Sequence, residues 1–278
     1  MKKINRRSFL AAAGLTAAAL ALTACGGSAS STASSTASSA ASSEAASTSA
    51  AAELTTVEAG KLTMATNAAF PPYEMTTDAG EFEGIDIDTA KAIAEKLDLE
   101  LQIDDMDFDA ALLSVQQGKA DIVMAGVTVT DERKAVMDFS DSYATGIQSI
   151  IVPEGSDITS PDDLAGKKIG TQRGTTGYIY CSDDFGDDAV VAYDDGLTAV
   201  QALNNGQVDA VVIDNAPAKE FVAANPGLVI LDTSYAEEDY AIGLAKGSAL
   251  EDAVNAALEE LKADGTLQSI VDKYITAE

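Results

Sequence analysis

The sequence predicts an α/β fold with two lobes of similar construction. Strand and helix patterns alternate from Lys61 onward, which is the signature of this fold class. The chain has 278 residues, and about 225 of them follow the N-terminal segments described below, enough for one large domain or two of about 100 each. A short helix–glycine–strand unit also occurs twice, which favours two lobes.

The alternating elements can be read directly from the order of apolar residues. They are KLTMAT (61–66, strand), FEGIDIDTAKAIAEKL (82–97, turn and helix), LELQIDDM (99–106, strand), FDAALLSVQQG (108–118, helix), ADIVMAG (120–126, strand) and KKIGTQRGTTGYIY (167–180, strand, loop and helix start). In the first helix, Ala90, Ile93, Ala94 and Leu97 recur at helical spacing. The second helix ends at Gly118, a residue that commonly closes helices.

The repeated unit is LLSVQQGKADIVMAG (112–126) followed downstream by AVQALNNGQVDAVVID (199–214). Each copy has a helix, a glycine, an aspartate three residues later and an apolar strand. The match is short, and common loop chemistry between helix and strand could also produce it.

The first 24 residues predict an export signal. MKKINRR is basic, and the following apolar run of 16 residues is shorter than the roughly 20 that a membrane-spanning helix needs. The run ends in Leu22-Thr23-Ala24-Cys25, which resembles the lipobox of bacterial lipoproteins, so Cys25 is expected to be acylated. An ordinary signal peptide with an incidental cysteine is the alternative, and Arg6-Arg7 leaves a twin-arginine route open.

Residues 25–57 are expected to tether the folded part to the membrane. The segment after Cys25 is almost wholly Ser, Ala, Thr and Gly up to residue 52, and such a composition cannot bury enough apolar surface to fold. The sequence therefore predicts a body held at the outer face of the cell membrane through its lipid anchor alone.

Composition excludes several classes of function. The chain carries 45 acidic against 17 basic residues, which makes nucleic acid an unsuitable partner. It has no histidine, and Cys181 is its only cysteine besides Cys25, so most zinc sites and histidine chemistry are excluded. No cofactor or metal is expected, and we expect a monomer.

Polar side chains follow four predicted strands at the point where each strand ends. In open α/β sheets ligands bind beyond the carboxyl ends of strands. Applied here, the rule selects Asn67, Phe70 and Tyr73, then Gly126, Thr128 and Arg133, then Gln172, Arg173, Thr175 and Thr176, and finally Asp214. Besides Arg6 and Arg7, the chain has only these two arginines. A cation, an anion, hydroxyl groups and aromatic rings suit a zwitterion.

Each candidate also has a purely structural interpretation. Arg133 could pair with Asp131 or Asp138 at the surface, and Asp214 could cap the helix that Asn215-Ala216-Pro217 begins. Thr175 and Thr176 could also serve only as helix caps. Phe70, Phe108 and Tyr73 could be core residues. Only their convergence favours a site.

Five segments together resemble one known family, the polar-amino-acid solute-binding proteins of ABC importers. They are GIDIDTAKAIAEKL (84–97), MDFDAALLSVQQGKADIVMAGVTVTDERKAVMDFSDSY (106–143), TQRGTTGY (171–178), VVIDNAPAKEF (211–221) and LEDAVNAALEELKADGTLQSIVDKY (250–274). The resemblance is collinear over residues 58–278 and covers essentially the whole predicted fold.

The resemblance implies a type II periplasmic-binding-protein fold, in which two lobes joined by two hinge strands close on the ligand. The strands would cross near residues 146–153 and 240–246. Lobe 1 would comprise residues 58–147 and 243–278, and lobe 2 residues 148–242.

The resemblance also implies a role for each candidate residue. Arg133 would bind the ligand α-carboxylate, helped by Thr128 and the Thr175/Thr176 loop. Asp214 would bind the α-ammonium group together with backbone carbonyl near Gly126. Phe70 and Phe108 would enclose the side-chain stem, with Asn67 and Gln172 near its end. Arg173 receives no role.

The implied function is an exported receptor that binds a free L-amino acid and delivers it to ABC permease subunits in the membrane. In the family, binders of basic side chains often carry an acid where this chain has Asn67, and some glutamine binders carry a lysine where it has Gln172, so the resemblance favours a neutral polar ligand. Glu74 could instead recruit a basic one, arginine or lysine. An enzyme on the same fold would need an acid–base group in the cleft, and only Glu74 offers one, so no enzymatic activity is expected.

Overall fold

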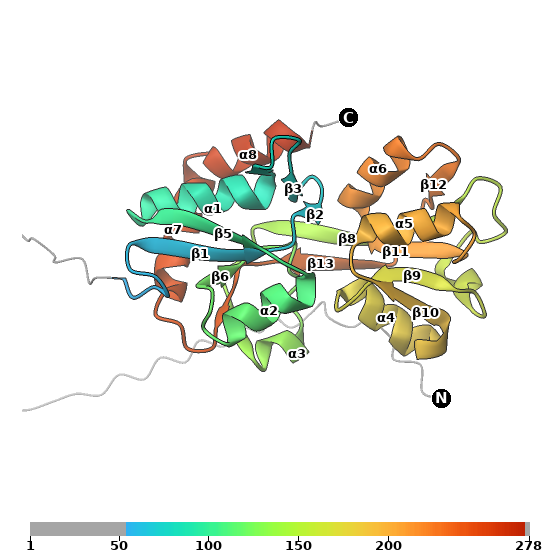
Figure 1. Cartoon of the computed structure of the whole chain (residues 1–278), viewed down its shortest axis with the longest axis horizontal. Coiled ribbons are helices and arrows are strands. Elements are labelled where there is room, and N and C mark those ends of the chain that lie inside the picture. Colours follow the sequence, from blue (N-terminus) through green and yellow to red (C-terminus); the bar gives the residue numbers. More distant parts are fainter. Residues whose placement is uncertain (1–53, 276–278) are drawn as a thin grey trace, which may run out of the picture. The chain divides into compact units, whose positions relative to one another are not determined.

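Two mixed β-sheets organise residues 54–275, which the computed structural model describes (Figure 1). The first sheet has the strand order β5-β1-β6-β14-β7. Its strands are β1 (Lys61–Thr66), β5 (Glu100–Asp105), β6 (Ile122–Val123), β7 (Met137–Phe139) and β14 (Gly243–Ala245). β1 is parallel to β5 and β6, whereas β14 is antiparallel to β6 and β7. The C-terminal part of the chain therefore completes a sheet begun near its start.

Helices flank the first sheet. They are α1 (Ile85–Lys96), α2 (Phe108–Gln116), α3 (Asp131–Lys134), α7 (Glu251–Ala263) and α8 (Thr266–Tyr274). Of these, α1, α2 and α7 bury apolar residues against the core. In α1 the predicted stripe is confirmed, since Ala90 and Ile93 have no exposed surface. α1 packs with α7 and α8, and α2 lies on the opposite side of the sheet from α1 (Figure 1).

The second sheet has the order β10-β9-β11-β8-β12, and β13 pairs with one end of β8. Its strands are β8 (Ala144–Pro153), β9 (Ile169–Gln172), β10 (Val190–Tyr193), β11 (Ala210–Asp214), β12 (Leu228–Ile230) and β13 (Ala236–Tyr240). The accompanying helices are α4 (Thr176–Phe185), α5 (Gly196–Asn204) and α6 (Asn215–Ala224), with short 3₁₀ turns η1 (Pro161–Leu164) and η2 (Asp187–Ala189). A small third sheet contains β2 (Ala69–Phe70), β3 (Glu74–Thr76) and β4 (Phe82–Glu83).

Two short connections join the large sheets and lie side by side. One runs through residues 140–143, between β7 and β8, and the other through residues 241–242, between β13 and β14. Tyr143 N–H donates to Tyr240 O over 3.0 Å, and Ser140 N–H donates to Ile242 O over 2.9 Å. Residues 148–153, part of the predicted first crossing at 146–153, pair with β11 and β12 inside the second sheet. None of the helices described is long and apolar enough to cross a bilayer.

The repeated sequence unit has the same structural role in both sheets. Gly118 and Gly206 each follow a helix with a left-handed φ, +66° and +67°. Asp121 then accepts the N–H of Thr63 over 2.8 Å and that of Val57 over 2.7 Å. Asp209 accepts the N–H of Lys168 over 2.7 Å, just before β9. In each copy the aspartate therefore accepts backbone hydrogen bonds at or near the start of the neighbouring parallel strand, β1 for Asp121 and β9 for Asp209.

Burial distinguishes the two copies and gives a stability prediction. Asp121 is 5 % exposed and satisfies two backbone donors, so Asp121→Ala should lower the free energy of unfolding by about 3 kcal/mol. Asp209 is exposed and satisfies one, so Asp209→Ala should cost less than about 1 kcal/mol. Urea unfolding of both variants measures the difference, and equal costs would contradict this role for the motif.

Candidate ligand-binding site

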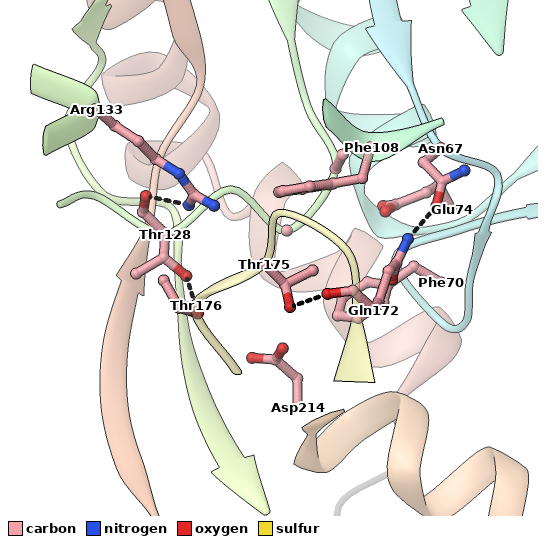
Figure 2. Close-up of a pocket in the computed structure, with 12 residues that line it drawn as sticks. Asn67, Phe70, Glu74, Phe108, Thr128, Arg133, Gln172, Thr175, Thr176 and Asp214 are labelled. Carbon is pink, nitrogen blue, oxygen red and sulfur yellow. Dashed lines mark hydrogen bonds between the residues drawn. The ribbon is translucent and has the colours of Figure 1, made fainter. Parts of the chain in front are cut away.

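One cavity brings together the ends of strands from both large sheets (Figure 2). The empty space among its lining atoms, the part open to solvent included, is about 310 Å³. All ten residues that the sequence analysis selected as ligand contacts line it, together with two others. The lining residues are Asn67, Phe70, Glu74, Phe108, Ala125, Gly126, Thr128, Arg133, Gln172, Thr175, Thr176 and Asp214. The rule that ligands bind beyond strand ends therefore finds one place in this fold.

Arg133 is a buried cation at one side of the cavity. It lies in α3, whose N-cap hydroxyl of Thr130 accepts the Arg133 N–H, and its side chain is 8 % exposed overall. Its Nη1 donates to Thr128 O over 2.7 Å, and its Nη2 donates to Gly174 O over 3.1 Å. Burial lowers the pKa of the guanidinium, against the opposing effect of Glu238.

The guanidinium of Arg133 is stacked and oriented but lacks a close counter-ion. Its Cζ lies 5.3 Å from the centre of the Phe108 ring, within range of a cation–π interaction. Among residues 54–275 no carboxylate oxygen forms an ion pair with it, and Asp138 pairs instead with Lys246. The surface-pair alternative is therefore wrong. A guanidinium has five N–H donors, so this one can still bind an anion in the cavity.

Asp214 is the buried anion at the end of β11. It occupies the N-cap position of α6, but its side chain makes no capping hydrogen bond. Its Oδ1 accepts the hydroxyl of Tyr240, and its Oδ2 accepts Gln148 Nε2 over 2.8 Å. Burial, together with the nearby charge of Glu238, raises the pKa of Asp214 to about 7. The Asp214 side chain therefore lines the cavity and does not cap α6.

Glu74 is a second buried carboxyl group, and its burial was not foreseen. It lies in β3, has no exposed surface, and neither of its oxygens has a hydrogen-bond partner in the described chain as a carboxylate. Burial raises its pKa well above the usual range, and the charge of Asp86 adds to this effect. A proton kept by Glu74 could be shared with Asp86. Only the three-stranded sheet brings Glu74 inward, and its strands are too short to leave a sequence pattern.

Two amide side chains close the cavity between the lobes. Gln172 Nε2 donates to Asn67 Oδ1 over 2.8 Å, and Asn67 Nδ2 donates to Met106 O over 2.9 Å. Asn67 follows β1 of the first sheet, and Gln172 ends β9 of the second. The Arg133–Gly174 hydrogen bond and the contacts of Thr128 Oγ1 with Thr176 and Glu238 are further polar contacts across the cavity.

Glycine is required where the first lobe approaches the cavity most closely. Gly126 has φ +56°, a conformation that few other residues adopt. A Cβ there would lie 2.7 Å from Cε1 of Phe70, so the ring packs directly on the glycine backbone. The Gly126 N–H donates to Asp86 Oδ2 over 3.0 Å, which fixes the orientation of this peptide.

Other candidates lie outside the cavity. Arg173 is at the surface, with its side chain 53 % exposed and its Nη2 3.6 Å from Asp194. Tyr73 is a core residue that packs edge-on against Tyr240. Thr175 lines the cavity but is also the N-cap of α4, where its hydroxyl accepts the Tyr178 N–H. Cys25 lies outside the described residues.

Two lobes that enclose a buried cation and buried carboxyl groups define a binding protein of the periplasmic type II class, and comparison with known proteins agrees. The profile of "Bacterial extracellular solute-binding proteins, family 3" matches residues 62–277. The chain belongs to this family of solute-binding proteins. The predicted fold class is thereby confirmed.

Curated relatives cover most of the chain. A "Probable histidine-binding protein" of Neisseria gonorrhoeae is 32 % identical over 99 % of this chain and 98 % of its own length. The "Arginine-binding extracellular protein ArtP" of Bacillus subtilis is 32 % identical over 78 % of this chain and 87 % of its own. Among solved structures, "An ancestral arginine-binding protein bound to arginine" is 43 % identical, with TM-score 0.74, over 78 % of this chain and 98 % of its own. A second structure, "An ancestral arginine-binding protein bound to glutamine", is 42 % identical, with TM-score 0.75, over 78 % of this chain and 99 % of its own.

The raised pKa of Asp214 makes stability depend on pH. An unfolded aspartate loses its proton near pH 4, whereas the folded one keeps it to about 7. The unfolding free energy should therefore fall as the pH rises from 4 to 7 and level off above that. Asp214→Asn should flatten this decline by roughly 2–4 kcal/mol, while Asp183→Asn, at an exposed position of α4, should leave it unchanged.

Melting temperatures measured between pH 4.5 and 8 without added ligand test this directly. The comparison concerns the slope with pH and not the absolute stability, because the asparagine also alters hydrogen bonds to Tyr240 and Gln148. Parallel curves for the wild type and Asp214→Asn would contradict the assignment.

Proposed function

We propose that the protein is an exported receptor that binds a basic L-amino acid, arginine above all, between its lobes and delivers it to an ABC permease. The observation that carries the choice of ligand is Glu74. As a carboxylate it is fully buried and has no hydrogen-bond partner among the described residues, and it faces the same cavity as Arg133 and Asp214 (Figure 2). Buried carboxylates need a cation or a proton, and a guanidinium supplies the charge with matching geometry.

The three charged groups divide the cavity into three parts. Arg133 would bind the α-carboxylate, Asp214 the α-ammonium, and Glu74 the side-chain cation. Phe70 and Phe108, both less than 10 % exposed, would enclose the apolar stem between them. An amino acid with a positive side chain complements all three groups, whereas a neutral one leaves Glu74 without a partner.

Relatives support this class of ligand. Several carry names or titles that refer to arginine or histidine. Asn67 and Gln172 favoured a neutral polar ligand in the sequence, but the structure joins these amides to each other, so they do not by themselves define the ligand. A neutral polar amino acid such as glutamine is the second candidate, since a related structure holds glutamine.

We further propose that Cys25 is acylated and that residues 25–57 tether the body to the outer face of the cell membrane. The support is the order of basic segment, apolar run and small residues before Cys25, together with the Ser/Ala-rich segment after it. We also propose that the lobe boundaries lie near residues 147 and 243. The protein is proposed to act as a monomer when it delivers its ligand.

A thermal-shift screen of the chain from Gly26 against the twenty amino acids and ornithine tests the ligand class. Saturating ligand stabilises the folded state by a few kcal/mol, and we expect the largest shift with L-arginine. Glu74→Gln should reduce the preference for arginine over glutamine by at least about 10-fold, since it removes the matching charge. Glu83→Gln, at an exposed position of β4 in the same small sheet, is the matched control.

The screen has two informative failures. A large shift with a neutral polar amino acid and none with arginine would establish the second candidate. An unchanged preference in Glu74→Gln would show that Glu74 does not contact the side chain, whatever the ligand.

Arg133 and Arg173 offer a matched pair for the carboxylate assignment. Arg133→Ala should weaken L-arginine binding by at least about 100-fold, because the buried α-carboxylate loses its only cation in the cavity. Arg173→Ala removes the same charge from the surface and should change the affinity by less than about 2-fold. Isothermal titration calorimetry measures both, and equal affinities in the two variants would refute the assignment.

A further inference from the structure

Glu238 is a buried carboxylate behind the cavity that no functional assignment above uses. It lies in β13, the strand that leads back to the first lobe, and it is 7 % exposed. Its neighbours Glu237 and Asp239 are exposed, since successive strand residues point to opposite faces. The chain thus turns one acid of a very acidic segment inward, where burying a charge is costly unless donors surround it.

Three donors converge on a single oxygen of Glu238. Its Oε2 accepts Thr176 Oγ1 over 2.9 Å, Gln148 Nε2 over 3.0 Å and Thr128 Oγ1 over 3.2 Å. Thr128 follows the first sheet, and Thr176 begins α4 beside the second. In all three hydrogen bonds the Glu238 oxygen is the acceptor.

This direction decides what the two threonines offer to a ligand. Each hydroxyl has one proton, and in both cases that proton points at Glu238. Thr128 and Thr176, which both line the cavity, can therefore accept a further hydrogen bond but cannot donate one, and Thr176 Oγ1 already accepts Gln148 Nε2 over 3.3 Å. The Thr175 hydroxyl is similarly engaged, since it donates to Gln172 O over 2.9 Å. The expectation that these hydroxyls help to bind a carboxylate thus conflicts with their proton count.

The same network reaches the anion of the cavity. Gln148 Nε2 donates both to Glu238 Oε2 and to Asp214 Oδ2, so one amide bridges the two carboxylates. Two carboxyl groups and two accepting hydroxyls are consequently linked in one hydrogen-bond network beside the cavity. A group with several N–H donors and a positive charge is the chemical match for such an arrangement.

We propose that Glu238 is a positioning residue for the ligand α-ammonium group: it holds the Thr128 and Thr176 hydroxyls as acceptors and adds its charge to that of Asp214. The inference rests on the proposed function and deepens it. The consequence is selectivity for ligands that carry an α-ammonium group. A ligand without this group provides no donor for the threonine oxygens and the carboxyl groups.

The test compares two ligands in two variants of the chain from Gly26. L-arginine carries the α-ammonium group, and 5-guanidinopentanoic acid is the same molecule without it. Glu238→Gln should weaken L-arginine binding roughly 10- to 100-fold and the deaminated analogue by less than about 3-fold. Glu237→Gln removes an exposed carboxylate one residue away and should change neither affinity. Calorimetry, with competition titrations for the weaker ligand, provides the dissociation constants.

Equal losses for both ligands in Glu238→Gln would overturn the inference, because a merely structural residue would affect them alike. Thr128→Val is the second variant, in case Glu238→Gln does not fold. It should weaken L-arginine binding more than binding of the analogue, and the same loss for both would assign the hydroxyl to the carboxylate instead.

Failure of the proposed function is recognisable separately. If the wild type prefers another amino acid, the ligand assignment is wrong. The Glu238→Gln comparison is then repeated with that amino acid and its deaminated form, and equal losses for the two would overturn the inference. A wild type that binds no amino acid at all would overturn both.

Discussion

Arg133 is a guanidinium taken out of water without a carboxylate beside it, and the arrangement of the cavity follows from that constraint. Two backbone carbonyls, those of Thr128 and Gly174, and the face of Phe108 stabilise it. Carbonyl dipoles and an aromatic ring only partly replace the hydration of a buried cation. The positive charge therefore remains available, and the most favourable partner is an anion that enters the cavity from outside.

The carboxyl groups around the same cavity have the opposite imbalance. Asp214 and Glu74 are buried, and for each of them burial raises the pKa. Pairing any of them directly with Arg133 would satisfy both charges and leave nothing for a ligand. The fold prevents this by placing them on separate elements, β3 and β11, away from α3. The separation of charges inside one closed space is what makes a zwitterion with a third charge the complementary molecule.

Lobe closure and ligand binding depend on the same atoms. The Arg133 side chain from the first lobe reaches the Gly174 carbonyl of the second, and Gln172 reaches back to Asn67. Residues that would contact a ligand thus also form the contacts between lobes. Opening breaks these hydrogen bonds and exposes Arg133 to water, so the energy of closure and the energy of binding are linked.

Strand ends and the repeated Gly-x-x-Asp unit could be predicted because each leaves a local signal. Asp121 and Asp209 recur at one spacing since each fastens a neighbouring strand. Arg133 and Asp214 stand out as rare charges after apolar runs. Glu74 was a candidate contact for a basic ligand, but its complete burial could not be predicted, because its strand has three residues and its burial depends on packing between the small sheet and α1. In β13, Glu238 lies two residues before buried Tyr240 and therefore on the same, inward face of the strand. The exposed acids on either side of Glu238 hide this alternation in the sequence.

Glu74 also shows why ligand class and protonation belong to one equilibrium. A neutral carboxyl group can donate a hydrogen bond and accept one, which suits an amide, whereas the ionised group suits a guanidinium. Burial and Asp86 favour the neutral form in the closed cavity. A cationic side chain must displace that proton, and its affinity then falls as the pH falls below the pKa of Glu74, while the affinity for a neutral amide does not. Preference for one class of amino acid is therefore set by the free energy of a single proton as much as by the shape of the cavity.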